Sequence, residues 1–306
     1  MRLAAIDIGS NAVRCLISEV DHHYARPLKL KLLRIPVRLG MDTFTRGHIS
    51  PEKRADLIRT LQIYQLLMEI YKVEDYRACA TSAVRDAANA GEIVREIRQL
   101  TGIEIEVIDG KEEASIVFET HISQHLNPER SYLYIDVGGG STDLTLFARG
   151  GEKVYNSFNI GTVRLMTGKV PDTEWERMRK WLASNAGDER LTGVGSGGNI
   201  NSIFQLSRRK SGALLSYEFI AGFCKEIHAL DLNGRMRKYG LKPDRADVIG
   251  HACKIFTSIM EWTGIRKMKV PQIGLADGII QLLAEKHGYR PKGPPVGWRN
   301  AGKIIE

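Results

Sequence analysis

The strongest constraint on the fold is a repeated motif, an apolar strand that ends in Asp-x-Gly and a small polar turn. The motif occurs as Ala4–Asn11 (AAIDIGSN) and again as Leu133–Gly140 (LYIDVGGG), and a second apolar run follows each copy. Each copy is therefore expected to form a β-hairpin with a glycine-bearing turn. Asp7 and Asp136 lie 129 residues apart, which is about one domain length. We expect two similar α/β domains, each offering one loop to a shared cleft.

Strand-like and helix-like runs alternate around the two hairpins, which is the pattern of an α/β protein. The strand-like runs are 28–39, 77–81, 103–108, 154–158 and 192–195, and the helix-like runs are 51–73, 86–99, 111–125, 173–183, most of 199–262, and 276–287. We expect domains at 1–118 and 119–306. The segment from residue 290 lacks periodicity and is expected to be an extended tail that could return to the first domain.

Composition and charge narrow the class of protein. Lys and Arg exceed Asp and Glu by 44 to 36, a net charge of +8, which favours an anionic partner. Nucleic acid is not expected, because no basic run with interleaved aromatic residues is present. No membrane association is expected either, since charges interrupt the first twenty residues and no run approaches about 18 apolar residues. The expected location is cytoplasmic. The four cysteines are far apart and do not suggest zinc.

The glycine turns are candidate phosphate sites, because glycine lets backbone N–H groups approach an anion closely. The second turn, Gly138–Thr142, is the richer of the two, and an aspartate before such a turn can hold Mg²⁺ or orient water. A simple hairpin turn is the alternative for either loop alone. A third glycine loop, Gly193–Gly198, fits G-x-G-x-x-G. A phosphate or nucleotide loop suits it better than a dinucleotide site, because Glu218, the acidic residue about 20 positions on, lies in a helix-like run.

Two further segments could serve an anion site. Arg85 lies where the strand-like run before Thr81 passes into a helix, a corner that suits phosphate. The alternative is an N-capped helix with a surface arginine. Glu112 and Glu113 open a helix after Asp109-Gly110, where carboxylates also favour the helix dipole.

With these residues together, the sequence resembles the exopolyphosphatase and guanosine pentaphosphate phosphohydrolase (Ppx/GppA) family, a branch of the actin-like ATPase superfamily. The resemblance spans about residues 3–285 and suits the short two-domain form. Its motifs are Ala5–Asn11 with Arg14, Thr81–Ala87 with Asn89, Val107–Ala114, Ile135–Thr142 and Ile160–Leu165.

The resemblance implies an α/β fold of two duplicated actin-like (ribonuclease H-like) domains that flank an interdomain cleft. It also implies a hydrolase that releases terminal phosphate from inorganic polyphosphate, guanosine pentaphosphate or both, by Mg²⁺-assisted attack of an activated water. The implied catalytic residues are Glu113, which would activate the water, and Asp136. The implied metal ligands are Asp7, Asp136 and Asp143. The implied substrate-binding residues are Ser10, Asn11, Arg14, Arg85, Gly138, Gly139, Gly140, Ser141, Thr142, Gly197 and Gly198.

Several positions depart from the family pattern. Ala12 replaces a hydroxyl residue, Ser115 replaces an arginine, and Asp143 replaces a glutamate. These changes leave open a catalytically weak sensor of polyphosphate or of an alarmone nucleotide. An actin-like sugar or acetate kinase is a third reading, but it leaves Glu112 and Glu113 unexplained. A homodimer is also left open.

Overall fold

The computed structural model describes residues 1–24, 26–121, 127, 129–148, 153–186 and 191–289. Its contacts divide the chain into two units. The first contains the described residues up to 121 together with 273–289, and the second contains those from 127 to 272. The expected domain boundary after residue 118 stays a prediction, and the expected tail from residue 290 lies outside the described residues.

The sheet of the first unit is built on the first hairpin. Its strand order is β3-β2-β1-β4-β5, in which β1, β2 and β3 are antiparallel neighbours and β4 and β5 run parallel to β1. β1 is buried at every position after the first, so it is the central strand of this sheet. The bounds are β1 Arg2–Ile8, β2 Val13–Glu19, β3 Leu28–Ile35, β4 Asp75–Ala80 and β5 Ile105–Val107.

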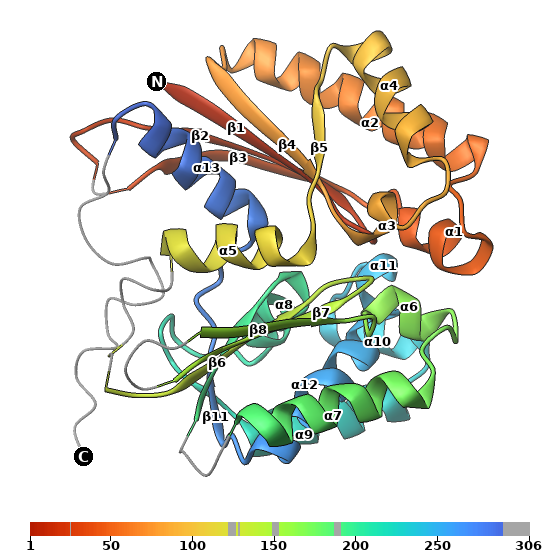
Figure 1. Cartoon of the computed structure of the whole chain (residues 1–306), viewed down its shortest axis with the longest axis vertical. Helices are drawn as coiled ribbons and strands as arrows, with labels where there is room; N and C mark the ends of the chain where they lie inside the picture. The colour runs from red at the N-terminus through yellow and green to blue at the C-terminus, as the bar shows by residue number, and fades with distance from the viewer. Residues whose placement is uncertain (25, 122–126, 128, 149–152, 187–190, 290–306) are drawn as a thin grey trace. The chain divides into compact units, whose positions relative to one another are not determined.

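Helices cover both faces of this sheet, with α5 and α13 on one side and α2 and α4 on the other (Figure 1). Ser50 caps the long helix α2 by accepting a hydrogen bond from the Lys53 backbone N–H, and Pro51 occupies its first turn. The last helix of the described chain, α13, packs on α5 and β1 and so belongs to the first unit. The bounds are α1 Leu39–Arg46, α2 Pro51–Ile70, α3 Ser82–Arg85, α4 Ala90–Thr101, α5 Gly110–His121 and α13 Leu275–Lys286.

The second unit repeats the topology of the first. Its sheet order is β10-β11-β9-β6-β7-β8, and the part β8-β7-β6-β9-β11 has the same directions as β3-β2-β1-β4-β5. The duplication predicted from the repeated motif is therefore present in both sheets. The bounds are β6 Tyr132–Val137, β7 Thr142–Phe147, β8 Lys153–Phe158, β9 Thr192–Ser196, β10 Leu215–Ser216 and β11 Lys267–Lys269.

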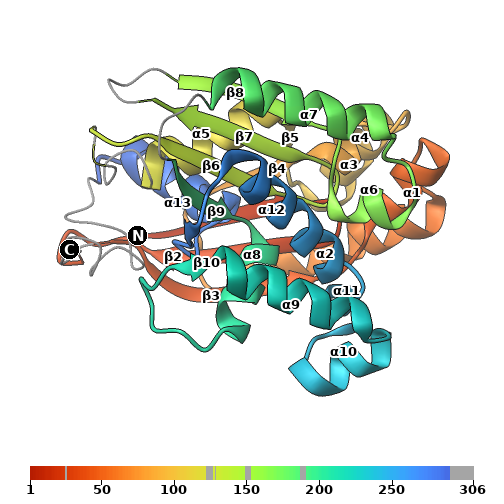
Figure 2. The same cartoon turned by 90° about the horizontal axis from the view of Figure 1, so that it is seen from below.

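Helix α12 organises the core of the second unit. It packs against α9, α7, α6, α8 and strand β6, and Phe256 on it is fully buried (Figure 2). The bounds are α6 Thr162–Met166, α7 Asp172–Asn185, α8 Gly198–Leu206, α9 Tyr217–Ala229, α10 Leu232–Tyr239, α11 Pro243–Ala246 and α12 Ile249–Thr263. None of the described helices has the length and apolar character that crossing a bilayer requires.

Two segments differ from the expected secondary structure. The expected strand 28–39 ends at Ile35, because Arg38 adopts a left-handed conformation (φ 63°) and helix α1 starts after it. The expected helix 86–99 begins only at Ala90, as α4, and a separate short helix, α3, occupies Ser82–Arg85 before it. The Asn89 side chain lies between them and bonds both the N–H and the carbonyl of Ile49, at 3.0 and 2.8 Å. Asn89 is thus bound to a residue 40 positions away, and periodicity does not reveal a long-range contact of this kind.

We predict that Gly278→Ala destabilises the protein by about 1–3 kcal/mol, because a Cβ there would lie 2.6 Å from the Ile116 carbonyl oxygen on α5. The matched control is Gly222→Ala, since nothing lies within 4 Å of that helical site. Alanine there should be neutral or stabilise by about 0.5–1 kcal/mol. Chemical denaturation measures both. Equal effects of the two variants would contradict the packing of α13 on α5.

Candidate active site

The first hairpin ends in an ion pair. Asp7, near the end of β1, lies directly opposite Arg14 on β2. Arg14 Nη1 donates to Asp7 Oδ2 at 2.6 Å, and the Asp7 side chain is only 8% exposed. Removing the arginine would leave a buried carboxylate without this partner, which is costly. The pair therefore orients Asp7 and stabilises the end of the hairpin.

The turn of this hairpin is bound to two helices. Ser10 is buried, and its Oγ lies 2.9 Å from the Oγ of Ser82 at the start of α3. The Ser10 carbonyl accepts from the Gly40 N–H at 2.8 Å, and the Asn11 carbonyl accepts from the Arg38 N–H at 3.1 Å. The Ser10–Ser82 contact brings the expected residue Ser10 next to the helix that carries Arg85, and the expected residue Asn11 contacts the start of α1.

Arg85 connects that helix to the segment before Glu113. Its Nη1 donates to the Ile108 carbonyl at 2.9 Å. Asp109 follows and caps α5, because its side chain accepts from the Glu112 N–H at 2.7 Å and its carbonyl accepts from the Glu113 N–H at 3.0 Å. Arg85 thus supports the start of the helix on which Glu113 lies.

The two neighbouring glutamates have different surroundings. The Glu112 carboxylate accepts a hydrogen bond from Arg77 Nη2 at 2.8 Å, and Arg77 also binds Glu106. These two glutamates raise the Arg77 pKa above its usual range. Glu113 is half-buried and is displaced by about 100° around the helix. The two carboxylates therefore face different surroundings, and Glu112 already forms an ion pair.

The second hairpin has two acidic residues where the first has an ion pair. Asp136 on β6 lies directly opposite Asp143 on β7, and these positions match Asp7 and Arg14 in the repeat. Asp143 is 4% exposed and accepts from Ser141 Oγ at 3.0 Å and from the Tyr155 hydroxyl at 2.8 Å. Directly opposite residues of an antiparallel pair point to the same face. The sheet thus presents two carboxylates side by side.

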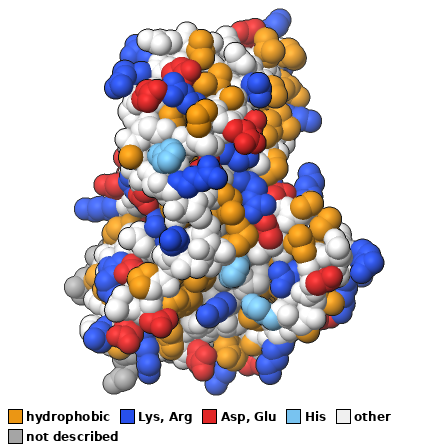
Figure 3. Space-filling view, turned by 90° about the vertical axis from the view of Figure 1, so that its right-hand side faces the viewer, with side chains coloured by type: hydrophobic (Ala, Val, Ile, Leu, Met, Phe, Trp, Pro, Cys, Tyr) orange, Lys and Arg blue, Asp and Glu red, His pale blue; other side chains and the backbone are white. Residues whose placement is uncertain are grey.

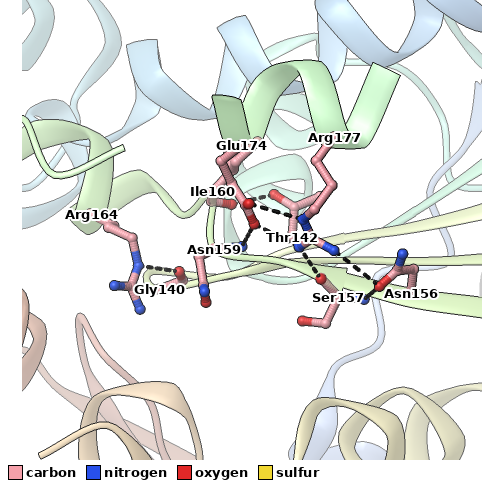
Figure 4. A network of polar contacts seen from close by, with 9 residues as sticks. All are labelled: Gly140, Thr142, Asn156, Ser157, Asn159, Ile160, Arg164, Glu174 and Arg177. Atoms are coloured by element: carbon pink, nitrogen blue, oxygen red, sulfur yellow. Dashed lines mark hydrogen bonds and ion pairs between the residues drawn. The ribbon is translucent and has the colours of Figure 1, made fainter. Parts of the chain in front are cut away.

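The glycine loop of this hairpin is held by helix α6. The Gly138 carbonyl accepts from the Thr162 N–H at 3.1 Å, and the Gly139 carbonyl accepts from the Val163 N–H at 2.8 Å. The Gly140 carbonyl accepts from Arg164 Nε at 2.9 Å (Figure 4). The peptide unit is planar and trans, so the N–H that follows each carbonyl points the opposite way. The loop therefore turns three consecutive N–H groups away from α6, an arrangement that suits an anion.

The hydroxyls of Ser141 and Thr142 bind within the protein. Ser141 Oγ donates to Asp143, and Thr142 Oγ1, which is fully buried, donates to the Ile160 carbonyl at 2.5 Å. Both side chains organise the loop in this structure. Their expected contact with a substrate stays a prediction.

The third glycine loop lies against Asp136. Gly197 has φ 91°, and a Cβ there would be 2.7 Å from Asp136 Oδ1. Helix α8 begins at Gly198, and Asn199 on it donates to the Val137 carbonyl at 3.2 Å. The structure thus brings Gly197 and Gly198 together with Asp136. The spacing of the motifs in the sequence did not predict this contact.

Two arginines near the site are absent from the residues that the sequence predicted. Arg164, which binds the glycine loop, lies inside the Ile160–Leu165 motif, so a sequence signal for it existed. Arg34 on β3 lies directly opposite Arg14 on β2 in the strand register. It adds a second cation to the row that contains Asp7 and Arg14. Only the strand register reveals Arg34, and no local motif marks it. Within the described ranges, no three His, Cys, Asp or Glu side chains form a group that could hold a metal ion by themselves.

A family model, described as the Ppx/GppA phosphatase family, matches residues 16–287. The chain belongs to the Ppx/GppA phosphatase family. Among its relatives is exopolyphosphatase 2 of Mycobacterium tuberculosis, 27% identical over 92% of this chain and 98% of that protein. Another is the guanosine-5'-triphosphate,3'-diphosphate pyrophosphatase of Aeromonas hydrophila, 26% identical over 93% of this chain and 60% of that protein.

Solved structures of Ppx/GppA proteins share the fold. An exopolyphosphatase from Cytophaga hutchinsonii superposes with a TM-score of 0.78 at 24% identity, over 96% of this chain and 100% of that one. The Aquifex aeolicus family member gives a TM-score of 0.72 at 24% identity, over 95% and 99%. The predicted family and the predicted α/β class with duplicated actin-like units are confirmed.

We predict that Gly161→Ala disrupts the glycine loop, because a Cβ there would lie 2.3 Å from the Gly139 carbonyl oxygen and 2.4 Å from the Gly140 carbonyl carbon. Both atoms are backbone, so the loop or α6 must move. The expected cost is about 1–3 kcal/mol or more of stability, measured by denaturation. Gly222→Ala in the same unit is the control. A Gly161→Ala protein as stable as this control would show that the loop does not depend on contact with α6.

Proposed function

We propose that this Ppx/GppA protein is a phosphoanhydride hydrolase that releases terminal phosphate from inorganic polyphosphate, guanosine pentaphosphate or both. The main support is the second hairpin, in which three N–H groups of the glycine loop point one way beside two paired carboxylates. The names of the two relatives agree with these two substrate classes.

The backbone N–H groups of Gly139, Gly140 and Ser141 follow the three loop carbonyls. They are suited to the non-bridging oxygens of the terminal phosphate. Fixed donors of this kind stabilise the charge that spreads over these oxygens as the phosphoanhydride bond breaks. Arg164 and Thr162 keep the loop carbonyls turned toward α6, which keeps the donors in place. Their contribution is to orient the loop.

Glu113 is the residue we assign as general base. It takes a proton from the attacking water, and the water oxygen bonds to phosphorus as the bond to the leaving phosphate breaks. Glu112 is less suited to this role because Arg77 already holds its carboxylate. Glu113 belongs to the first unit, and Asp136 belongs to the second.

Asp136 and Asp143 are the residues we assign to Mg²⁺. Carboxylates paired on one face of a hairpin fit a cation that takes one or two protein carboxylates and completes its shell with water and phosphate oxygens. Bound there, Mg²⁺ would neutralise phosphate charge. Asp7 was expected as a third ligand, but Arg14 already forms an ion pair with it. We therefore assign Asp7 mainly to the support of the hairpin.

Arg14 and Arg85 remain the proposed phosphate-binding cations of the first unit. The net charge of +8 also favours a polyanionic substrate. On the face shown in Figure 3, Lys and Arg side chains lie among acidic and uncharged ones.

We predict that Glu113→Gln lowers kcat by roughly 10²–10⁴-fold, because amide nitrogen cannot accept the proton from water. Substrate binding and the thermal midpoint should change little. The matched control is Glu112→Gln, which removes a charge from the adjacent position and should retain most activity. Phosphate release from polyphosphate and from guanosine pentaphosphate, with and without Mg²⁺, measures both.

Equal turnover in the two variants would remove Glu113 from the mechanism. A wild-type protein that binds these substrates but releases no phosphate would overturn the hydrolase and identify a sensor.

A further inference from the structure

Helix α2 carries apolar side chains on two opposite faces. One face is buried, and Tyr64 on it donates its hydroxyl hydrogen to the Val13 carbonyl on β2 at 2.8 Å. Ile63, Leu66 and Ile70 lie about half a turn around the helix from the centre of the buried face. They are 47%, 58% and 74% exposed, so the core of the first unit does not use them. We name these three residues the outer seam.

The outer seam differs from the usual surface of a helix. A surface helix normally has one apolar and one polar face, and a helix that is apolar on both sides is normally covered on both. Single exposed leucines are common, but three large apolar side chains on adjacent turns form a continuous patch, which indicates a contact surface. Helix α4 packs on a different side of α2, where Arg54 pairs with Glu92 at 2.6 Å (Figure 1).

The spacing of the outer seam fits a second helix of the same kind. Its members are separated by three and four residues, and Arg59 extends the row by four residues toward the start of α2. This spacing is that of the contact row of a coiled coil, in which two helices meet at a shallow angle. In an antiparallel pair of α2 helices about a two-fold axis, Ile63 of each copy lies against Leu66 of the other.

The charges at the two ends of the outer seam favour the antiparallel arrangement. Arg59 at one end has a side chain that is 74% exposed, and its ion-pair partner Asp56 on the same helix is 3.8 Å away. Glu69 at the other end is exposed. An antiparallel pair places Arg59 of each copy beside Ile70 and Glu69 of the other, so opposite charges flank the apolar centre. A parallel pair would place the two arginines together.

We propose that the protein forms a homodimer in which the outer seam of α2 packs, antiparallel, on the outer seam of a second copy. The occupant is a second copy because the row is complementary to itself in both spacing and charge. With Arg59, the row spans about 16 Å of the helix, which is a short contact among specific interfaces, so association is expected at micromolar concentrations. The inference concerns assembly and stands independently of the proposed hydrolase.

Sedimentation equilibrium of the full-length protein between about 1 and 100 µM tests the proposal. The wild type should change from monomer to dimer over this range. Leu66→Glu should weaken the dimer roughly 30-fold or more, because it places a charge in the apolar centre, and should leave the thermal midpoint of the dilute protein unchanged. The matched control is Leu232→Glu on α10, a leucine that is 43% exposed in the second unit, which should dimerise like the wild type.

Two outcomes would overturn the homodimer. One is a wild-type protein that stays monomeric over the whole concentration range, in which case the outer seam would belong to a contact with a different protein. The other is a dimer that Leu66→Glu and Leu232→Glu weaken equally.

A charge exchange tests the antiparallel arrangement. Arg59→Glu and Glu69→Arg each place like charges side by side across the interface, and each should weaken the dimer roughly threefold or more. The double variant restores opposite charges in each pair, so it should dimerise more tightly than either single variant. A double variant that dimerises no more tightly than the single variants would contradict the antiparallel pairing.

Discussion

The arrangement of the candidate site depends on the pairing of residues at the end of two duplicated hairpins. In the first, Asp7 faces Arg14, and in the second, Asp136 faces Asp143. The two hairpins have the same strand order and register. The position that Arg14 occupies in the first hairpin is occupied by Asp143 in the second. The first hairpin therefore contains an ion pair that stabilises it, whereas the second presents the acidic pair that suits a divalent cation.

The surrounding elements keep this acidic pair and the glycine loop in place. Tyr155 and Ser141 hold Asp143, and Gly197 passes so close to Asp136 that a side chain would not fit. Helix α6 binds the carbonyls of the loop, so the following N–H groups face the opposite side. In the first unit, Arg85 and Asp109 fix the start of the helix that carries Glu113. Several of the expected residues thus depend on partners outside their own motif.

The sequence predicted the parts that are encoded locally. The repeat around Asp7 and Asp136 predicted both hairpins and the duplication, because strand alternation and glycine turns act within a few residues. It missed Arg34, which joins the row of Asp7 through strand register, and the contact of Gly197 with Asp136. It also gave no sign that Gly278 on α13 packs on α5. Long-range packing of this kind has no periodic signal.

The central claim is that Asp136 and Asp143 bind Mg²⁺, whereas Asp7 mainly supports its hairpin. The most direct measurement is phosphate release over a series of Mg²⁺ concentrations in the wild type, Asp143→Asn and Asp7→Asn. The account predicts that Asp143→Asn raises the half-activating Mg²⁺ concentration by roughly tenfold or more. Asp7→Asn should leave that concentration unchanged and lower the thermal midpoint. An equal rise in the Mg²⁺ requirement of both variants would contradict the account and make Asp7 a metal ligand.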